Sequence, residues 1–140
     1  MNVLIDTNIA IDVLIQREPF FDYSQLVLLA SEQEYINGFI SASAITDIYY
    51  ITNKVLKNDK ATRELIKKHL MKTVRIASVD EETIFKALGT GWRDFEDCVQ
   101  YYVGESISAD YIVTRNPEDF ACDKISVVTP QKLLDIIAPE

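Results

Sequence analysis

The N-terminal segment Val3-Leu4-Ile5-Asp6 constrains the fold of this chain more than any other stretch. Its three apolar residues, two of them β-branched, are typical of a strand buried on both faces of a parallel sheet. Asp6 stands where this strand ends, and ligand sites in open α/β sheets gather at the carboxyl ends of strands. Thr7 or Asn8 can cap the helix that follows. The segment therefore predicts an α/β fold with a carboxylate at the functional edge of its sheet.

Short apolar stretches and amphipathic stretches alternate along the rest of the chain. Besides the first strand, apolar and β-branched residues predict strands at 38–41, 73–77, 111–114 and 125–128. Apolar residues at helical spacing predict helices at 9–14, 20–31, 43–55, 59–71, 80–88, 94–107 and from 130 onwards. Asp80, Asp94 and Thr129 stand where their side chains can cap three of these helices. The alternation predicts a five-stranded, mostly parallel sheet covered by helices on both faces.

The size and composition of the chain suit a single domain over residues 1–140. Hydrophobic residues make up 48% and charged residues 26%, an ordinary balance for a folded protein. No apolar run approaches the roughly 20 residues that cross a bilayer, and the N-terminus has no signal-peptide pattern. We therefore expect no membrane association and a cytoplasmic location. Cys98 and Cys122 form no motif, and we expect buried, reduced thiols rather than a disulfide.

Charge is distributed unevenly along the chain. A net charge of −8 argues, at face value, against a nucleic-acid partner. Residues 54–75, however, contain eight basic and two acidic residues, so this segment carries +6 and the remainder carries −14. Such a basic segment is either a phosphate-binding face beside an acidic pocket or a solvated helix surface.

Acidic residues recur next to the predicted strand ends. Asp6 follows the first strand, and Asp47 lies just past the second, in the first turn of a helix. Asp97 lies in the first turn of a later helix, and Asn116 and Asp119 follow the strand at 111–114. Carboxylates that converge without a cation repel one another, and oxygen ligands are what Mg²⁺ and Mn²⁺ require. We therefore expect a divalent-cation site that activates water against a phosphodiester.

Each of these residues also has a purely structural interpretation. Asp6 could be a helix N-cap, Asp47 could be favoured by the helix dipole, and Asp97 could belong to a capping box. For these three residues the metal-site interpretation is favoured, because several acids recur next to predicted strand ends. Asn116 and Asp119 could instead fix the turn after the strand, and for them both interpretations stay open.

Residues near these acids have possible supporting roles. Thr7, Asn8 and Thr114 could orient metal ligands or water, or could serve only as caps and strand-end hydrogen-bonding groups. Asp12 is expected to be a polar position on the first helix. Arg115 could contact a phosphate or pair with one of the acids.

Two further expectations concern Glu96 and the tyrosines. We expect Glu96 to face solvent beside the capping residue at 94. The tyrosine pairs at 49–50 and 101–102 could stack on bases, although core or dimer packing is favoured.

Absent residue types exclude several mechanisms. His69 is the only histidine, which leaves neither a two-histidine nuclease mechanism nor a histidine-rich zinc site. The chain has no glycine-rich phosphate loop and no P-loop. The segment after Asp6 also lacks the second aspartate expected of a phosphatase of the haloacid dehalogenase type.

Four stretches resemble the acidic motifs of a PIN domain. They are Val3-Leu4-Ile5-Asp6-Thr7-Asn8, Asp47 in its helix, Asp94-Phe95-Glu96-Asp97, and Thr114-Arg115-Asn116-Pro117-Glu118-Asp119-Phe120. They occur in the family's order from residue 3 to 120, so the resemblance covers nearly the whole chain. The chain looks most similar to the small stand-alone members, such as VapC toxins of bacterial toxin–antitoxin pairs.

The resemblance implies a three-layer α/β/α fold with a five-stranded parallel sheet. It also implies Mg²⁺- or Mn²⁺-dependent cleavage of single-stranded RNA, a homodimer, and inhibition by a cognate antitoxin protein. Position by position, Asp6, Asp47 and Asp97 match the first three acids, and Asn116 or Asp119 the fourth. The second acid of the family is more often glutamate, so the shorter Asp47 reaches less far toward a metal. Asn116 replaces a frequent aspartate, which weakens the case for a second cation.

The expected function is therefore a metal-dependent endoribonuclease of the VapC type. Its expected catalytic acids are Asp6, Asp47, Asp97 and Asp119, with Asp6, Asp47, Asp97 and Asn116 as metal ligands. The alternative is a catalytically weak PIN-like module that binds RNA or a protein partner. A metal-dependent phosphatase or DNA nuclease is a third possibility.

Overall fold

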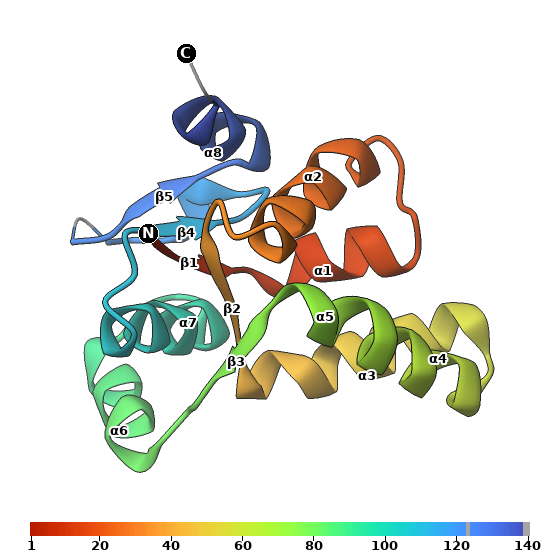
Figure 1. Cartoon of the computed structure of the whole chain (residues 1–140). Coiled ribbons are helices and arrows are strands. Elements are labelled where there is room, and N and C mark those ends of the chain that lie inside the picture. The colour runs from red at the N-terminus through yellow and green to blue at the C-terminus, as the bar shows by residue number, and fades with distance from the viewer. Residues whose placement is uncertain (123, 139–140) are drawn as a thin grey trace.

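The computed structural model describes residues 1–122 and 124–138. Within these residues five strands form one sheet, in the order β3-β2-β1-β4-β5, and every neighbouring pair is parallel (Figure 1). The predicted α/β fold with a five-stranded parallel sheet is confirmed. The strands are β1 (Asn2–Ile5), β2 (Asn37–Ser41), β3 (Arg75–Ala77), β4 (Tyr111–Val113) and β5 (Ser126–Val128).

Helices cover both faces of the sheet. Val3 and Ile5 lie in one apolar cluster, whereas Leu4 lies in the other, because successive side chains of a strand point to opposite faces. All three are fully buried, and each stabilises the fold by about 1.5–3 kcal/mol. The helices are α1 (Thr7–Leu14), α2 (Phe21–Glu32), α3 (Ala42–Leu56), α4 (Asp59–Leu65), α5 (Met71–Thr73), α6 (Glu81–Thr90), α7 (Phe95–Ser106) and α8 (Pro130–Ile137).

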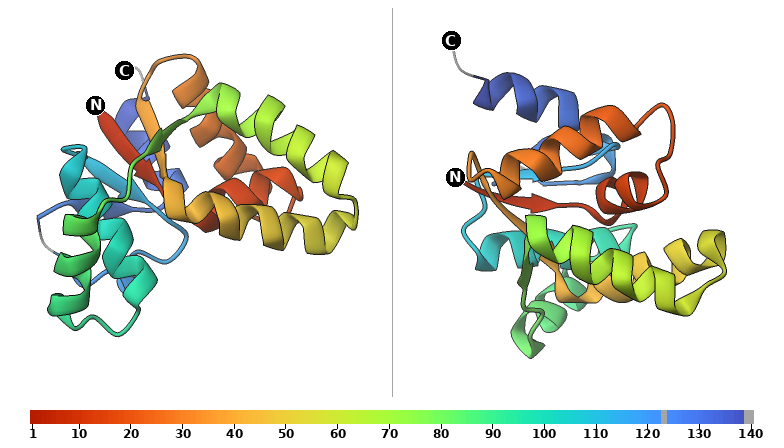
Figure 2. Two further views of the ribbon diagram at one scale, coloured as in Figure 1. Left: turned by 90° about the horizontal axis from the view of Figure 1, so that it is seen from below. Right: turned by 45° about the vertical axis from the view of Figure 1, so that its right-hand side comes forward.

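The two layers of helices differ in size. The cluster around Val3 and Ile5 includes residues of α1, α2, α3 and α8, and the cluster around Leu4 includes residues of α6 and α7. The views of Figure 2 show α3 running back against the segment from α4 to α5, as a helical arm that extends from the sheet. A π-helical turn, Ile66–Leu70, joins α4 to α5, so the single helix predicted at 59–71 is one helical run with a π turn. None of the helices in the described residues is long and apolar enough to cross a membrane.

Side-chain caps decide where most of these helices begin. Asp80, Asp94 and Thr129 cap α6, α7 and α8 as predicted, and each such cap is worth about 1 kcal/mol. The cap of α1 is Asp6, not Thr7 or Asn8, because the helix begins immediately after the strand. The helix predicted at 80–88 is longer than expected, since α6 continues to Thr90 and is capped by Gly91, whose φ of 76° is left-handed.

The close approach of α7 to the sheet depends on Gly104. A Cβ atom at this position would lie 3.1 Å from Cδ1 of Ile125 and 3.5 Å from Cδ1 of Ile112. Both isoleucines are buried beneath the helix. The missing side chain therefore lets α7 pack directly against β4 and the residue that precedes β5.

Candidate functional site

A pocket with a volume of about 310 Å³ opens at the carboxyl ends of β1 and β4. Residues from α1, the start of α7 and the segment after β4 contribute to its walls. Five carboxylic acids line it: Asp6, Asp94, Glu96, Asp97 and Asp119. Thr7, Asn8, Thr114 and Asn116 line it as well. The tertiary structure thus brings every predicted site residue except Asp47 to one pocket.

Asp6 is held rigidly at the base of this pocket. Its Oδ1 accepts hydrogen bonds from Thr7 N at 2.8 Å and from Gln100 Nε2 at 3.0 Å, and its Oδ2 accepts one from Thr114 Oγ1 at 2.7 Å. Only 8% of the residue is exposed. Burial raises the pKa of Asp6, whereas the hydrogen bonds from Thr114, Thr7 and Gln100 favour the ionised form. The three donors fix the orientation of the carboxylate.

Gln100 is a site residue that sequence reasoning missed. It lies on α7, is 3% exposed, and its Nε2 also lies 3.4 Å from Thr7 Oγ1. Among the described residues its Oε1 has no hydrogen-bond partner. The available signal was its spacing of three residues from Asp97, because residues at this spacing share a helix face.

Asp97 lies in the first turn of α7, as predicted. Its backbone N–H donates to Asp94 Oδ1 at 3.1 Å, so Asp94 is the cap and the carboxyl group of Asp97 is left for the pocket. Burial raises the pKa of Asp97 to about 7, helped by the charges of Asp6, Asp94 and Asp119. The pocket therefore retains a proton near neutral pH, which relieves part of the repulsion between its acids.

The position of Asp47 corrects one prediction. The second strand ends at Ser41, as predicted, and the Ser41 side chain caps α3. The helix begins at Ala42, one residue before the predicted start, so Asp47 is its sixth residue and not part of its first turn. Among the residues that the structure describes, Asp47 is not one of those that line the pocket. Its contact is a hydrogen bond with Glu96, a residue that does line the pocket.

Glu96 is exposed, as expected, but it also lines the pocket and interacts with Asp47. Its hydrogen bond with Asp47 raises its pKa to about 7, and burial and the charge of Asp47 add to this effect. Asp47 thus reaches the acidic pocket only through Glu96.

Asn116 and Asp119 border the pocket from the segment that follows β4. Asp119 ends the short 3₁₀ turn Pro117–Asp119, and its N–H donates to Asn116 O at 3.0 Å. Asn116 N donates to Thr114 Oγ1 at 3.3 Å. Backbone groups of Asn116 and Asp119 therefore form this turn, and both side chains line the pocket.

Asp12 is a polar position on the first helix, as expected, but its side chain is not on the helix surface. It is fully buried, and its carboxylate lies 2.9 Å from Arg115 Nε and 3.7 Å from Arg17 Nη1. Of the two roles open to Arg115, the structure shows pairing with an acid. Burial raises the pKa of Asp12, and the charges of Arg115 and Arg17 oppose this.

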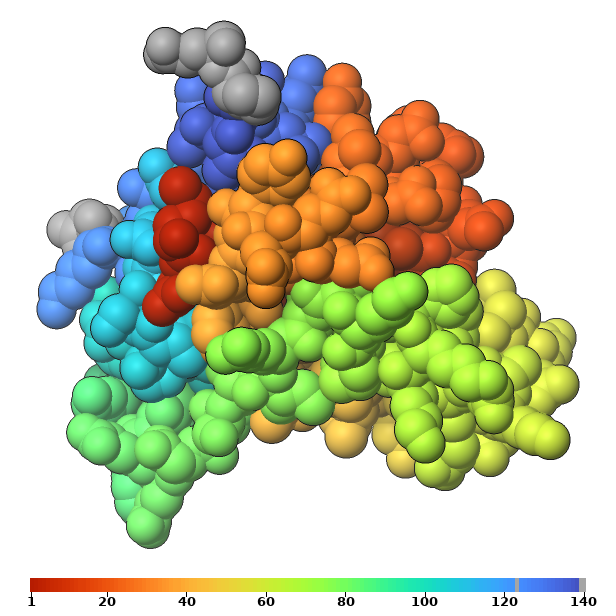
Figure 3. All heavy atoms as spheres, viewed as in Figure 1, coloured from red at the N-terminus to blue at the C-terminus, as the bar shows by residue number. Residues whose placement is uncertain are grey.

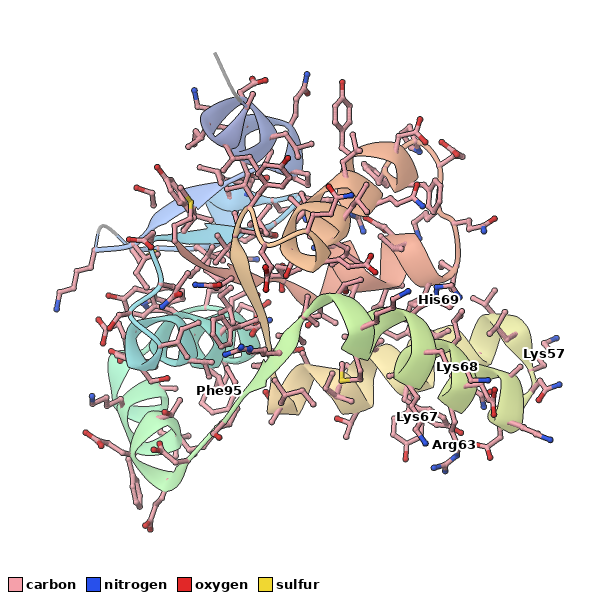
Figure 4. All side chains as sticks on the ribbon, in the orientation of Figure 1. Lys57, Arg63, Lys67, Lys68, His69 and Phe95 are labelled. Atoms are coloured by element: carbon pink, nitrogen blue, oxygen red, sulfur yellow. The ribbon has the colours of Figure 1, made fainter. Side chains whose placement is uncertain are left out.

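The basic segment lies mostly on the helical arm formed by α3, α4 and α5, which Figure 3 shows as a lobe at the lower right, apart from α6. Part of its charge is locally paired, because Arg63 Nε lies 2.8 Å from Asp59 and Lys68 Nζ lies 2.7 Å from Glu64. Figure 4 labels Lys57, Arg63, Lys67, Lys68 and His69 on this arm.

The tyrosine pairs serve different purposes. Tyr101 is 6% exposed and its hydroxyl donates to Glu105 at 2.7 Å, so this tyrosine is a core residue. Tyr49 donates to Asp59, whereas Tyr50 is 69% exposed. Tyr50 is therefore the exposed ring of the first pair, whereas Tyr102 of the second pair is half-buried.

The donor chemistry of the pocket fits a hard divalent cation. Carboxylate and amide oxygens surround it, and the charges of Asp6, Asp94 and Asp119 add to burial in raising the pKa of Asp97. Asn8 Oδ1 is a buried oxygen without a hydrogen-bond partner within residues 1–122 and 124–138. In that same part of the chain no three acidic, histidine or cysteine side chains stand close enough to form a ready-made metal cluster. The residues present could hold a cation once the acids are ionised and drawn together.

Comparison with known proteins gives one family and one fold. A sequence profile described as PIN domain matches residues 2–118, and a comparison with curated proteins finds no match. The chain is similar to the solved structure of VapC20 from Mycobacterium tuberculosis, described as a Sarcin-Ricin loop cleaving toxin. That match has a TM-score of 0.62 and 15% identity, and covers 79% of this chain and 86% of the other.

Two further similar structures come from complexes bound to DNA. One is VapBC2 from Rickettsia felis with a fragment of their promoter, with a TM-score of 0.68, 14% identity, and coverage of 92% of this chain and 98% of that chain. The other is FitAB bound to an IR36 DNA fragment, with a TM-score of 0.63, 19% identity, and coverage of 91% and 94%. At such identities the likeness establishes a shared fold.

Proposed function

The chain belongs to the PIN domain family, and from this premise we propose that it is a divalent-metal-dependent endoribonuclease of the VapC toxin type. The match over residues 2–118 confirms the resemblance noted in its sequence. One observation carries the proposal: Asp6, Asp97, Asn116 and Asp119, which are far apart in the sequence, line one pocket at the carboxyl ends of two neighbouring strands.

The side chains divide the work of the proposed reaction. Asp6, Asp97, Asn116 and Asp119 would hold Mg²⁺ or Mn²⁺. When bound, the cation lowers the pKa of water and neutralises charge that develops on the phosphodiester. Asp97 must release its proton for this, because a protonated carboxyl group is a poor ligand for a cation.

The groups around these ligands fix their orientation. Thr114 and Gln100 donate to the two oxygens of Asp6 and keep the carboxylate directed. Asp47 acts at one remove, through its hydrogen bond to Glu96. This indirect contact agrees with the short reach of an aspartate at the second acidic position.

Single-stranded RNA is the proposed substrate. VapC20, a protein with this fold, is described as a Sarcin-Ricin loop cleaving toxin. The basic arm from Lys54 to Arg75 supplies positive charge that the acidic pocket lacks. Because two similar structures were solved as VapBC2 and FitAB complexes, we also propose that a cognate antitoxin protein binds this chain, which acts as a homodimer.

Asp6→Asn tests the proposal directly. The substitution preserves size and fold but removes the charge of the best-ordered acid, so we expect Mn²⁺-dependent cleavage of a fluorescent single-stranded RNA to fall by about 100-fold or more. Asp135→Asn, at an exposed position on α8, is the matched control and should cleave at the wild-type rate. Unchanged cleavage by Asp6→Asn would remove this residue from the mechanism. Faster cleavage of single-stranded DNA or of a small phosphate ester would support the third possibility.

A module that binds without catalysis is the second candidate. The asparagine at position 116 and the distance of Asp47 from the pocket favour it. Calorimetric titration with Mn²⁺ near pH 7.5 separates the two candidates. Measurable binding that is lost in Asp6→Asn supports the nuclease, whereas no heat of binding in the wild-type protein supports the binding module.

A further inference from the structure

The acidic pocket is also lined by a basic side chain, that of Arg17. Arg17 lines the same pocket as Asp6, Asp97 and Asp119, and it is the only basic residue among the described residues that does so. No ion pair joins Arg17 to the five pocket acids within the described chain; its recorded partner is Asp12. The guanidinium is thus present beside the pocket without neutralising it.

The backbone around Arg17 is fixed. Its N–H donates to Asp12 O at 2.9 Å, at the end of α1, and its carbonyl accepts from Phe20 N at 3.1 Å and Phe21 N at 2.9 Å. These bonds hold the connection between α1 and α2. The starting point of the side chain is therefore set by the scaffold, not by a free loop.

Asp12 is the acidic partner of the Arg17 side chain. This carboxylate is fully buried between two arginines, with Arg115 Nε at 2.9 Å and Arg17 Nη1 at 3.7 Å. Arg115 is the closer and more enclosed partner: 20% of its side chain is exposed, and its guanidinium lies 4.1 Å from the centre of the Phe20 ring. Arg17, in contrast, has 40% of its side chain exposed.

Two arginines, Arg17 and Arg115, share one aspartate, Asp12, so one positive charge has no matching negative charge. Asp12 carries one negative charge and already has a close counter-ion in Arg115, so Arg17 is not needed to neutralise it. A guanidinium has five N–H donors, and one contact at 3.7 Å leaves most of them unused. Guanidinium groups match the oxygens of a phosphate with two parallel hydrogen bonds.

We propose that Arg17 forms a phosphate subsite of the pocket, which binds a phosphate group of the single-stranded RNA, and that Asp12 is the residue that positions it. This inference rests on the proposed function. The subsite explains how an acidic pocket can accept a polyanion: the metal ligands and the phosphate-binding group are separate side chains that line the same pocket. Arg115 belongs to the support of the subsite and does not touch substrate.

Arg17→Gln tests the subsite, with Arg17→Lys and Lys132→Gln as companions. Lys132 is an exposed basic residue on α8 and serves as the matched control. KM and kcat for a fluorescent single-stranded RNA are measured with Mn²⁺ over a range of salt concentrations. We expect Arg17→Gln to raise KM by about 10- to 100-fold and to lower the salt slope of binding by about 0.7, the value for one lost phosphate contact on a single strand. Arg17→Lys keeps the salt slope and recovers part of the affinity.

Two measurements separate this subsite from a structural role of Arg17. Calorimetric titration with Mn²⁺ alone should give the wild-type affinity in Arg17→Gln, and urea unfolding should show a folded protein. If Arg17→Gln loses stability but keeps the wild-type KM and salt slope, Arg17 merely supports Asp12 and the subsite is overturned. If its Mn²⁺ affinity falls instead, Arg17 acts on the metal ligands and the subsite is again overturned. If the wild-type protein neither binds nor cleaves RNA, the proposed function fails and the subsite fails with it.

Discussion

Asp97→Asn should make the metal-free protein more stable at alkaline pH. The ordinary pKa of an aspartate is 3.8, and burial beside other acids raises that of Asp97 to about 7. Between these values the unfolded chain has lost this proton while the folded protein keeps it. Stability of the metal-free protein therefore falls as the pH rises from about 4 to about 7, because the folded state binds more protons than the unfolded state.

The size of the effect follows from the shift. A shift of about three pKa units corresponds to roughly 4 kcal/mol as an upper limit. Asp97 lines an open pocket and is only partly buried, so solvent screening reduces this to about 1–2 kcal/mol. Asparagine has the same size and carries no charge. Asp97→Asn should therefore raise the free energy of unfolding by about 1–2 kcal/mol at pH 8 and change it little at pH 4.

Urea unfolding with a chelator at the two pH values measures this difference, with Asp135→Asn as the exposed control. The same experiment with Mn²⁺ should give the reverse order. At a hundredfold excess over its dissociation constant, a ligand stabilises the folded state by about 2.7 kcal/mol, and Asp97→Asn should lose most of this gain. The reasoning is refuted if the substitution destabilises the metal-free protein equally at both pH values, or if Mn²⁺ stabilises the variant as much as the wild type.

Two further predictions concern the supports of the site. Thr114→Val removes the 2.7 Å donor to Asp6 Oδ2 without changing the size of a buried side chain, so Mn²⁺ affinity should fall by about 10- to 100-fold in calorimetry. The control Thr46→Val, at an exposed position on α3, should bind Mn²⁺ as the wild type does. Equal Mn²⁺ affinities of the two variants would show that Thr114 does not orient Asp6. Gly104→Val places side-chain atoms against Ile125 and Ile112 and should lower the free energy of unfolding by about 1–3 kcal/mol in urea unfolding. Gly89→Val is the comparison, because Gly89 also lies in a helix but its surroundings are open. Similar losses of stability in the two variants would show that Gly104 is not needed for the close packing of α7.

The acidic pocket shows how far a linear pattern can predict a site. Asp6 was predictable because a buried strand that stops on a carboxylate places that group at the sheet edge. Asp97 was predictable because a capping aspartate three residues earlier fixes the start of its helix. Asp47 was assigned to the first turn of its helix, although it is the sixth residue of α3, and its place outside the pocket depends on how α3 packs in the tertiary structure.

Residues whose role depends on a distant partner could not be found in this way. Gln100 donates to a carboxylate 94 residues away in the chain; its spacing from Asp97 indicates a shared helix face but not this hydrogen bond. Asp12 appeared to be a surface position because helical spacing does not reveal that Arg115 lies across from it. The pairing of Glu96 with Asp47 is of the same kind.

The amino-acid sequence by itself determined the alternation of strands and helices, the caps of several helices and the family to which the chain belongs. These features depend on periodicity and on contacts between residues close together in the chain. Only the tertiary structure decided which side chains support the pocket and that Arg17 is the one basic residue that lines it among the described residues. Such contacts form between elements that meet after folding, and their distances are set by how α1, α7 and β4 pack around the first strand.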